Sequence, residues 1–110
     1  MDARAERIGR NEILFRELNE RIEGINEFLA AEATDASFVC ECARADCMER
    51  IRIERADYER VRADPAQFLV VEGHIVPDVE YVVEPREGWS IIRKRKGGPA
   101  ELAAASDPRS

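Results

Sequence analysis

The sequence predicts an α+β fold in which a long N-terminal amphipathic helix precedes a small antiparallel sheet of two hairpins and one short helix. Three observations lead to this prediction. Apolar residues over 6–30 follow a heptad pattern, apolar and charged residues alternate over 49–54, and glycine or proline stands where the later patterns stop. A chain of 110 residues is the size of one domain with a small core.

The long helix is predicted over residues 6–30. Its apolar residues recur at alternating spacings of four and three, which is the a/d pattern of helices that pack along a seam. We call this set the predicted seam: Ile8, Phe15, Leu18, Ile22, Ile25 and Leu29, with Asn11 in the remaining slot and Leu14 and Phe28 beside it. Because periodicity does not distinguish partners, we expect either a homodimer (or a protein partner) on this helix or a monomer whose helix crosses its own sheet.

The β-rich part is predicted to follow a small-residue linker over 30–37. Strands over 37–42 and 49–54 form one hairpin, a helix over 55–63 ends before Pro65, a strand covers 68–71, and strands over 79–83 and 89–93 form a second hairpin turned at 85–88. The basic run 93–96 is expected to be a solvated strand end. Residues 1–96 are thus one domain, and residues 97–110, rich in small and polar residues, are expected to be disordered.

Composition limits the function classes. Hydrophobic residues make up 45% and charged residues 36%, and the net charge of −6 opposes binding to phosphate backbones, so we expect no nucleic-acid partner. Residues 1–10 are polar, unlike a signal peptide, and no run approaches the roughly 20 apolar residues of a membrane span. We therefore expect a cytoplasmic protein without membrane contact, where thiols stay reduced.

All three cysteines lie within eight residues, and the one histidine comes 27 residues later. Cys40 and Cys42 flank one residue, so in an extended strand their side chains point to the same face. Cys47 returns after four residues, and His74 follows a predicted strand and a glycine. Three thiolates and one imidazole are the donors of a tetrahedral Cys₃His site, and an odd number of cysteines fits a disulfide framework badly.

The fourth ligand and the metal remain open at this point. Asp46 competes with His74 as the fourth ligand, and Glu41 and Glu49 are weaker competitors. Thiolate-rich tetrahedral sites bind zinc or take part in iron–sulfur clusters. The C-x-C start is similar to that of CDGSH-type iron–sulfur proteins, but the third cysteine comes too soon and the histidine too late, so Zn²⁺ is the expected ion and an iron–sulfur cluster the alternative.

The chain also resembles a family of small uncharacterised bacterial proteins with a C-x-C-x₄-C…G-H pattern. The resemblance covers residues 7–95 and lies in four segments: RNEILFRELNERI, FVCECARADCMERI, YERVRADPAQFLVVEGHIVPDVEYVVE and GWSIIRK. It implies that Cys40, Cys42, Cys47 and His74 belong to one recurrent pattern, and it brings no function of its own.

These observations favour a small non-enzymatic zinc-binding protein that acts as a protein-interaction or regulatory module. A closed four-ligand site has no open position for substrate, and the sequence offers no phosphate loop, nucleophile elbow or pair of catalytic carboxylates. A thiol-based redox or metal sensor is the alternative. A small enzyme, either a thiol oxidoreductase or a zinc hydrolase with a bound water, is a third hypothesis.

Overall fold

The computed structural model describes residues 3–29 and 35–109 and confirms the α+β class. The elements in chain order are α1 (Ala3–Leu29), β1 (Asp35–Val39), β2 (Arg50–Glu54), α2 (Arg55–Val61), β3 (Gln67–Val71), β4 (Glu80–Pro85), β5 (Trp89–Lys94) and α3 (Gly98–Ala105). The predicted linker begins in residues 30–34, outside the described residues, as do the side chains of Phe28 and Leu29. In the described part of the chain, no helix has the length and apolar character needed to cross a membrane.

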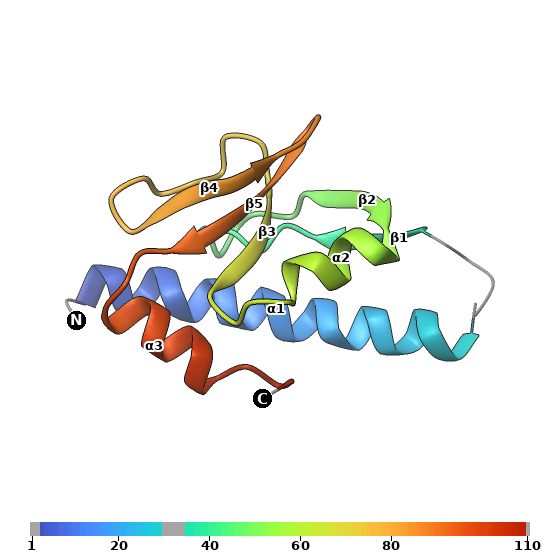
Figure 1. Ribbon diagram of the computed structural model, residues 1–110, viewed down its shortest axis with the longest axis horizontal. Coiled ribbons are helices and arrows are strands. Elements are labelled where there is room, and N and C mark those ends of the chain that lie inside the picture. The colour runs from blue at the N-terminus through green and yellow to red at the C-terminus, as the bar shows by residue number, and fades with distance from the viewer. Residues whose placement is uncertain (1–2, 30–34, 110) are drawn as a thin grey trace.

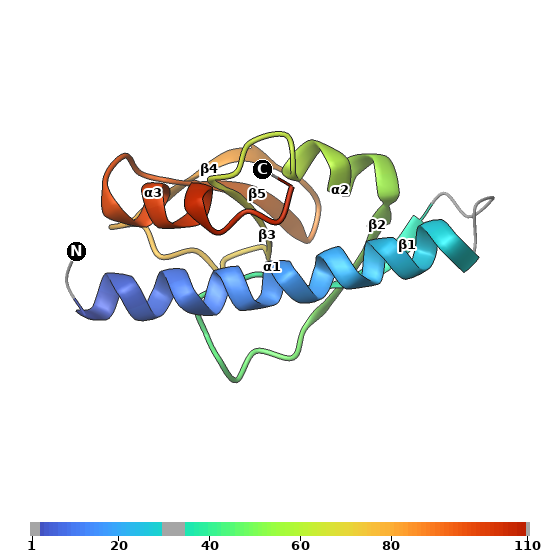
Figure 2. The same ribbon diagram turned by 90° about the horizontal axis from the view of Figure 1, so that it is seen from below.

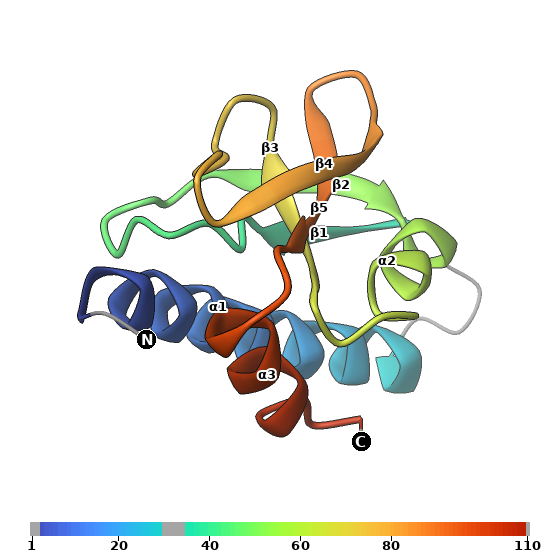
Figure 3. The same ribbon diagram turned by 60° about the vertical axis from the view of Figure 1, so that its left-hand side comes forward.

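The strands form two antiparallel sheets, and both predicted hairpins are confirmed. In the first sheet β1 pairs with β2, with Phe38 opposite Ile51. In the second sheet the order is β3-β5-β4, and the pairing of β4 with β5 shifts by one residue between Val82 and Glu84. Figure 1 shows the strands on one side of α1, which runs the length of the molecule, and Figure 3 shows α3 beside α1 under the same strands.

The apolar core lies between the sheets and α2. Alternation in β2 buries Ile51 and Ile53 and exposes the charged residues between them, as the sequence predicts. The rings of Phe38 and Tyr58 stack with centroids 4.3 Å apart and planes 11° from parallel. The remaining fully buried apolar side chains come from α2, β3 and β5: Val61, Phe68, Leu69, Val70 and Ile92.

The face that α1 turns toward the rest of the chain is largely polar. Its buried residues recur every three or four positions, and they are Ala5, Ile8, Glu12, Arg16, Asn19 and Glu23. The predicted seam is only partly covered, because Ile8 is buried whereas Leu18 and Ile25 are 41% and 57% exposed. The described part of the seam therefore does not lie on one side of α1: Ile8 packs on its own chain, Ile22 is partly buried, and Leu18 and Ile25 are exposed.

Hydrogen bonds to distant main-chain groups fix this polar face. Arg16 is fully buried and donates to the carbonyls of Pro65, at 2.6 Å, and Ala103, at 2.8 Å, with its guanidinium 4.8 Å from the Phe68 ring centroid. Asn11, which occupies the remaining slot of the predicted seam, donates to the carbonyl of Ala43 at 2.7 Å. Each polar side chain thus finds a partner inside its own chain, which offsets the cost of removing it from water.

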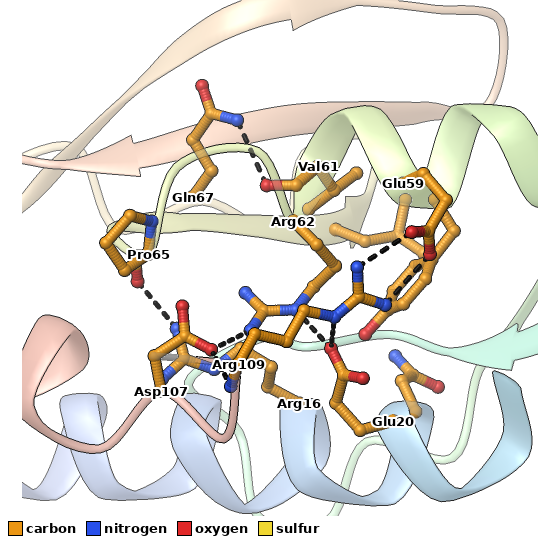
Figure 4. Close-up of polar contacts among 12 residues, drawn as sticks. Arg16, Glu20, Glu59, Val61, Arg62, Pro65, Gln67, Asp107 and Arg109 are labelled. Atoms are coloured by element: carbon orange, nitrogen blue, oxygen red, sulfur yellow. Dashed lines mark hydrogen bonds and ion pairs between the residues drawn. The ribbon is translucent and has the colours of Figure 1, made fainter. Parts of the chain in front are cut away.

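Residues 97–109 are ordered, which corrects the expectation of a disordered tail. Helix α3 begins with a proline in its first turn and packs against α1. At this contact, the Cδ2 of Leu102 is 3.5 Å from the point that a Cβ atom would occupy if Gly9 were replaced by a larger residue. Beyond α3, Asp107 pairs with Arg62, and Arg109 binds both carboxylate oxygens of Glu59 at 2.8 Å (Figure 4). Arginine–carboxylate pairs supply the tertiary contacts that composition alone does not reveal.

The expectation that the basic run 93–96 is a solvated strand end is wrong for Lys94, which is buried. Lys94 is 1% exposed, and its Nζ lies 2.7 Å from Glu12 Oε1 and 2.9 Å from Glu80 Oε1. Arg93 pairs with Asp64 at 2.7 Å. Burial raises the pKa of Glu12, and the neighbouring Glu80 raises it further. Lys94 is therefore a core residue that joins α1, β4 and β5 through charge.

Candidate metal centre

The structure brings Cys40, Cys42, Cys47 and His74 into one cluster. One ligand atom from each of the four lies within 4.8 Å of all the others. The His74 Nδ1 is 3.7 Å from the Sγ of Cys40 and 3.7 Å from the Sγ of Cys47. Cys40 and Cys42 are buried, and Cys47 and His74 are partly exposed. The chain therefore contains a Cys₃His group that could hold a metal ion.

The first two cysteines lie directly after β1, where the β1–β2 connection runs beside β3 of the second sheet. The Cys40 N–H donates to the carbonyl of Glu49 at 3.0 Å, which extends the β1–β2 hairpin by one residue. The next N–H, that of Glu41, donates to the carbonyl of Leu69 in β3 at 2.7 Å. This extended path puts Cys40 and Cys42 on one side and Glu41 on the other.

Two tight turns bring the remaining ligands to the cluster. The Cys47 N–H donates to the carbonyl of Arg44 at 3.1 Å, and the His74 N–H donates to the carbonyl of Val71 at 2.9 Å. Gly73 occupies the third position of the second turn with φ of 87°, a conformation that favours glycine in a type II turn. The glycine before the histidine thus serves to turn the chain at the end of β3.

Each sulfur accepts a main-chain N–H. Val71 donates to the Cys40 Sγ at 3.2 Å, Arg44 donates to Cys42 and Glu49 donates to Cys47. Hydrogen bonds to a thiolate favour the ionised form, which is the form that binds metal. The backbone around the cluster is therefore arranged for negatively charged sulfur.

The three thiols affect one another's ionisation, and one of them loses its proton more readily than the other two. The hydrogen bond from Cys40 lowers the pKa of Cys42 to about 5, and the same contact raises the pKa of Cys40. Burial raises the pKa of Cys47. One thiolate therefore forms readily, and its charge disfavours ionisation of the other two unless a cation compensates.

Glu41 is a buried residue of this region that sequence analysis placed only among weak ligands. It is fully buried, and burial raises the pKa of its carboxyl group. Its oxygens accept from Asn19 at 2.8 Å, from Tyr58 at 3.2 Å and from the N–H of Leu69 at 2.9 Å. A signal for this role exists in the sequence, since a residue between two inward-facing cysteines of an extended segment faces the opposite side.

The competing ligand Asp46 lies outside the cluster. Its side chain is 78% exposed and pairs with Arg44 at 3.4 Å. A hollow of about 450 Å³ opens beside the cluster, and it is lined by Arg44, Asp46, Cys47, Met48, Glu49 and His74. The partly exposed pair Cys47 and His74 is thus the side of the centre that solvent reaches.

Comparisons of this chain with protein-family models, with curated proteins and with solved structures gave no match. The resemblance to small bacterial proteins inferred from the sequence stays a prediction. The function is therefore argued from the geometry of the Cys₃His cluster and from the surfaces around it.

Proposed function

We propose that this chain is a small non-enzymatic zinc-binding module whose zinc is structural and which serves protein interaction or regulation. The observation that carries the proposal is the assembly of three sulfurs and one imidazole nitrogen within 4.8 Å, with a main-chain N–H directed at every sulfur. Three thiolates and one imidazole are one of the donor sets that bind a tetrahedral zinc ion.

The spacing favours one ion over a cluster of several. A tetrahedral zinc at about 2.3 Å from sulfur and about 2.0 Å from nitrogen holds a sulfur and a nitrogen about 3.5 Å apart and two sulfurs about 3.8 Å apart. The two sulfur–nitrogen distances of 3.7 Å in the structure differ from the expected value by only about 0.2 Å. An iron–sulfur cluster distributes its protein ligands over more than one iron, which spreads them farther apart.

A structural role follows from what the four ligands connect. Cys40, Cys42 and Cys47 belong to the β1–β2 connection, whereas His74 belongs to the turn after β3. One ion joins the two sheets, and metal binding then contributes directly to folding free energy. Four protein ligands also leave no coordination position for a substrate, which argues against catalysis.

The test is elemental analysis of the purified chain combined with thermal unfolding. We expect one zinc per chain in a colourless protein. Cys42→Ser and His74→Gln should both lose the zinc and melt at a lower temperature, while Asp46→Asn, a change in the same loop, should keep both properties. Absence of metal with three freely reactive thiols contradicts the proposal, and a visible charge-transfer band identifies iron–sulfur chemistry instead.

A redox sensor is the second candidate, and the exposure of one ligand favours it. Cys47 borders the open hollow, whereas Cys40 and Cys42 are each 1% exposed. An oxidant that reaches the zinc-bound sulfur of Cys47 first converts it from a thiolate ligand to a sulfenic acid, with release of the ion. Peptide mapping after peroxide treatment tests this: oxidation at Cys47 should accompany zinc release, and zinc retained by an oxidised chain contradicts the sensor.

A further inference from the structure

The outward face of α1 carries an apolar stripe that no described part of the chain covers. Leu14 is 60% exposed, and Leu18 and Ile25 are 41% and 57% exposed. These residues lie on the side of the helix opposite to the buried residues Glu12, Arg16 and Asn19, and Figure 2 shows no helix or strand in front of α1. A shallow hollow of about 260 Å³ crosses the stripe between Leu14, Phe15, Glu17, Leu18 and Arg21.

We propose that this stripe binds the same stripe of a second copy of the chain, with the two α1 helices antiparallel. The inference names the partner of the interaction module proposed above, but it depends on α1 and not on the metal. The residues Leu14, Leu18, Arg21 and Ile25 follow spacings of four, three and four, which are the a and d positions of a two-stranded helical pair.

Charge selects the antiparallel orientation. In a parallel pair, the exposed Arg7 lies opposite Arg7 of the second copy, and the exposed Arg21 lies opposite Arg21. Like charges then meet at two layers of the interface. In an antiparallel pair centred at residues 19–20, Leu14 of each chain faces Ile25 of the other. Arg21 then lies across Leu18 and reaches Glu17 of the second copy, so that its stem covers an apolar side chain and its head meets an acid.

The half-buried side chains beside the stripe fit the same arrangement. Phe15 and Ile22 lie on one flank of the stripe and are each partly buried, with Ile22 packed against the core of its own chain. The two-fold axis places Phe15 of one chain near Ile22 of the other, which continues the apolar contact at the edge. The self-complementary pattern is what a two-fold interface between identical surfaces requires.

The other exposed apolar segment is less suited to association. Tyr81, Val82 and Val83 of β4 are between 38% and 46% exposed and lie on a sheet edge. That edge contains a register shift, carries the charged Glu84 paired with Arg60, and ends in Pro85. Bulges, charges and proline are features that prevent a sheet edge from pairing with another strand.

Sedimentation of the wild type from about 1 to 200 µM is the first measurement, and a concentration-dependent mass approaching twice 12.5 kDa is expected. Leu18→Asp should raise the dissociation constant at least about tenfold. Because Leu18 is exposed in the single chain, circular dichroism and zinc content should stay unchanged. Met48→Asp, which alters an apolar residue that is 89% exposed elsewhere, is the matched control and should stay dimeric.

The orientation has its own test. Glu17→Arg places four arginines together in the antiparallel pair and should dissociate it, whereas a parallel pair does not bring Glu17 against Arg21 and should persist. Adding Arg21→Glu to that variant should restore association. A wild type that remains a monomer throughout, a Leu18→Asp variant that stays dimeric, or a dimer that Val82→Asp dissociates overturns the proposal. Loss of zinc from a chain that still dimerises counts against the zinc proposal alone.

Discussion

Glu41 and Leu69 hydrogen-bond to each other twice. The Glu41 N–H donates to the Leu69 carbonyl at 2.7 Å, and the Leu69 N–H donates to the Glu41 carboxylate at 2.9 Å. This pair joins the segment after β1 to β3, and Glu41 stands between Cys40 and Cys42 in the sequence. The same residue therefore connects the two sheets and holds the backbone that presents two sulfurs.

Glu41→Gln should weaken both functions of this pair. Asn19 and Tyr58 donate to one oxygen of Glu41, and the Leu69 N–H donates to the other. The amide nitrogen of a glutamine cannot accept, so at least one buried donor loses its acceptor at a cost of about 1–3 kcal/mol. Because groups that hold ligands in place tune metal affinity, zinc binding should fall by roughly 10–100-fold. A chelator competition measures the affinity, and Glu49→Gln, an exposed acid of the same loop, should leave it unchanged.

Lys94→Met should destabilise the fold strongly. The substitution removes the ammonium that lies between Glu12 and Glu80, both fully buried, and leaves two carboxylates to share one apolar site. Removal of one partner from a buried charge pair costs about 3–5 kcal/mol. Urea unfolding measures this loss, and the exposed Lys96→Met should change stability by less than about 0.5 kcal/mol. Equal effects of the two substitutions would refute the core role of Lys94.

Asp107→Ala tests whether the segment after α3 belongs to the fold. Asp107 pairs with the fully buried side chain of Arg62, which also pairs with Glu20. After the substitution, Glu20 remains as an acidic partner of Arg62 among the described residues. We expect a loss of about 2–3 kcal/mol in unfolding free energy, below the cost of a wholly unpaired buried charge. Asp35→Ala breaks the exposed pair with Arg52 and should cost less than about 1 kcal/mol. A disordered tail would make both substitutions equally mild.

Acid should release the contact between Glu59 and Arg109. The hydrogen bonds from Arg109 lower the pKa of Glu59 below its ordinary value of 4.5. A depressed pKa means that the contact stabilises the folded chain above pH 4.5 and that this contribution disappears as the pH falls through the lowered pKa. Because the Glu59 side chain is 52% exposed, the contribution is about 0.2–1 kcal/mol.

The measurement is the difference in unfolding free energy between the wild type and Glu59→Gln from pH 7 down to pH 3. The wild type should be more stable at neutral pH, and the difference should vanish at acid pH. Loss of zinc in acid affects both chains and cancels in the difference. A difference that persists unchanged at pH 3 contradicts the charged contact.

The strands and the Cys₃His cluster were predictable because their signals are local or exclusive. Ile51 and Ile53 alternate with charges, so one face of β2 had to be the buried face. The four residues of the cluster are the only cysteines and the only histidine of the sequence, so their residue types alone grouped them. That His74 and not Asp46 lies in the cluster needed the structure, since it depends on the turn at Gly73 and on an exposed loop.

The orientation of α1 was not predictable from its apolar pattern. The acceptors of Arg16 are carbonyls of Pro65 and Ala103, and a carbonyl has no signature in the sequence. The partners that bury Glu12 also lie in distant strands. The helix over 98–105 was not predicted for another reason. The small side chains of this segment are typical of disorder, but a proline in the first turn and a run of alanines are also typical of a helix.

The bond from Arg16 to the carbonyl of Ala103 joins residues 87 positions apart. A ribosome adds about 5–20 residues per second, so the nascent helix waits several seconds before this acceptor exists. Until then the guanidinium of Arg16 stays hydrated, because its burial without this acceptor is unfavourable. The polypeptide therefore reaches its native arrangement only after the segment around residue 103 has emerged, as one late cooperative event.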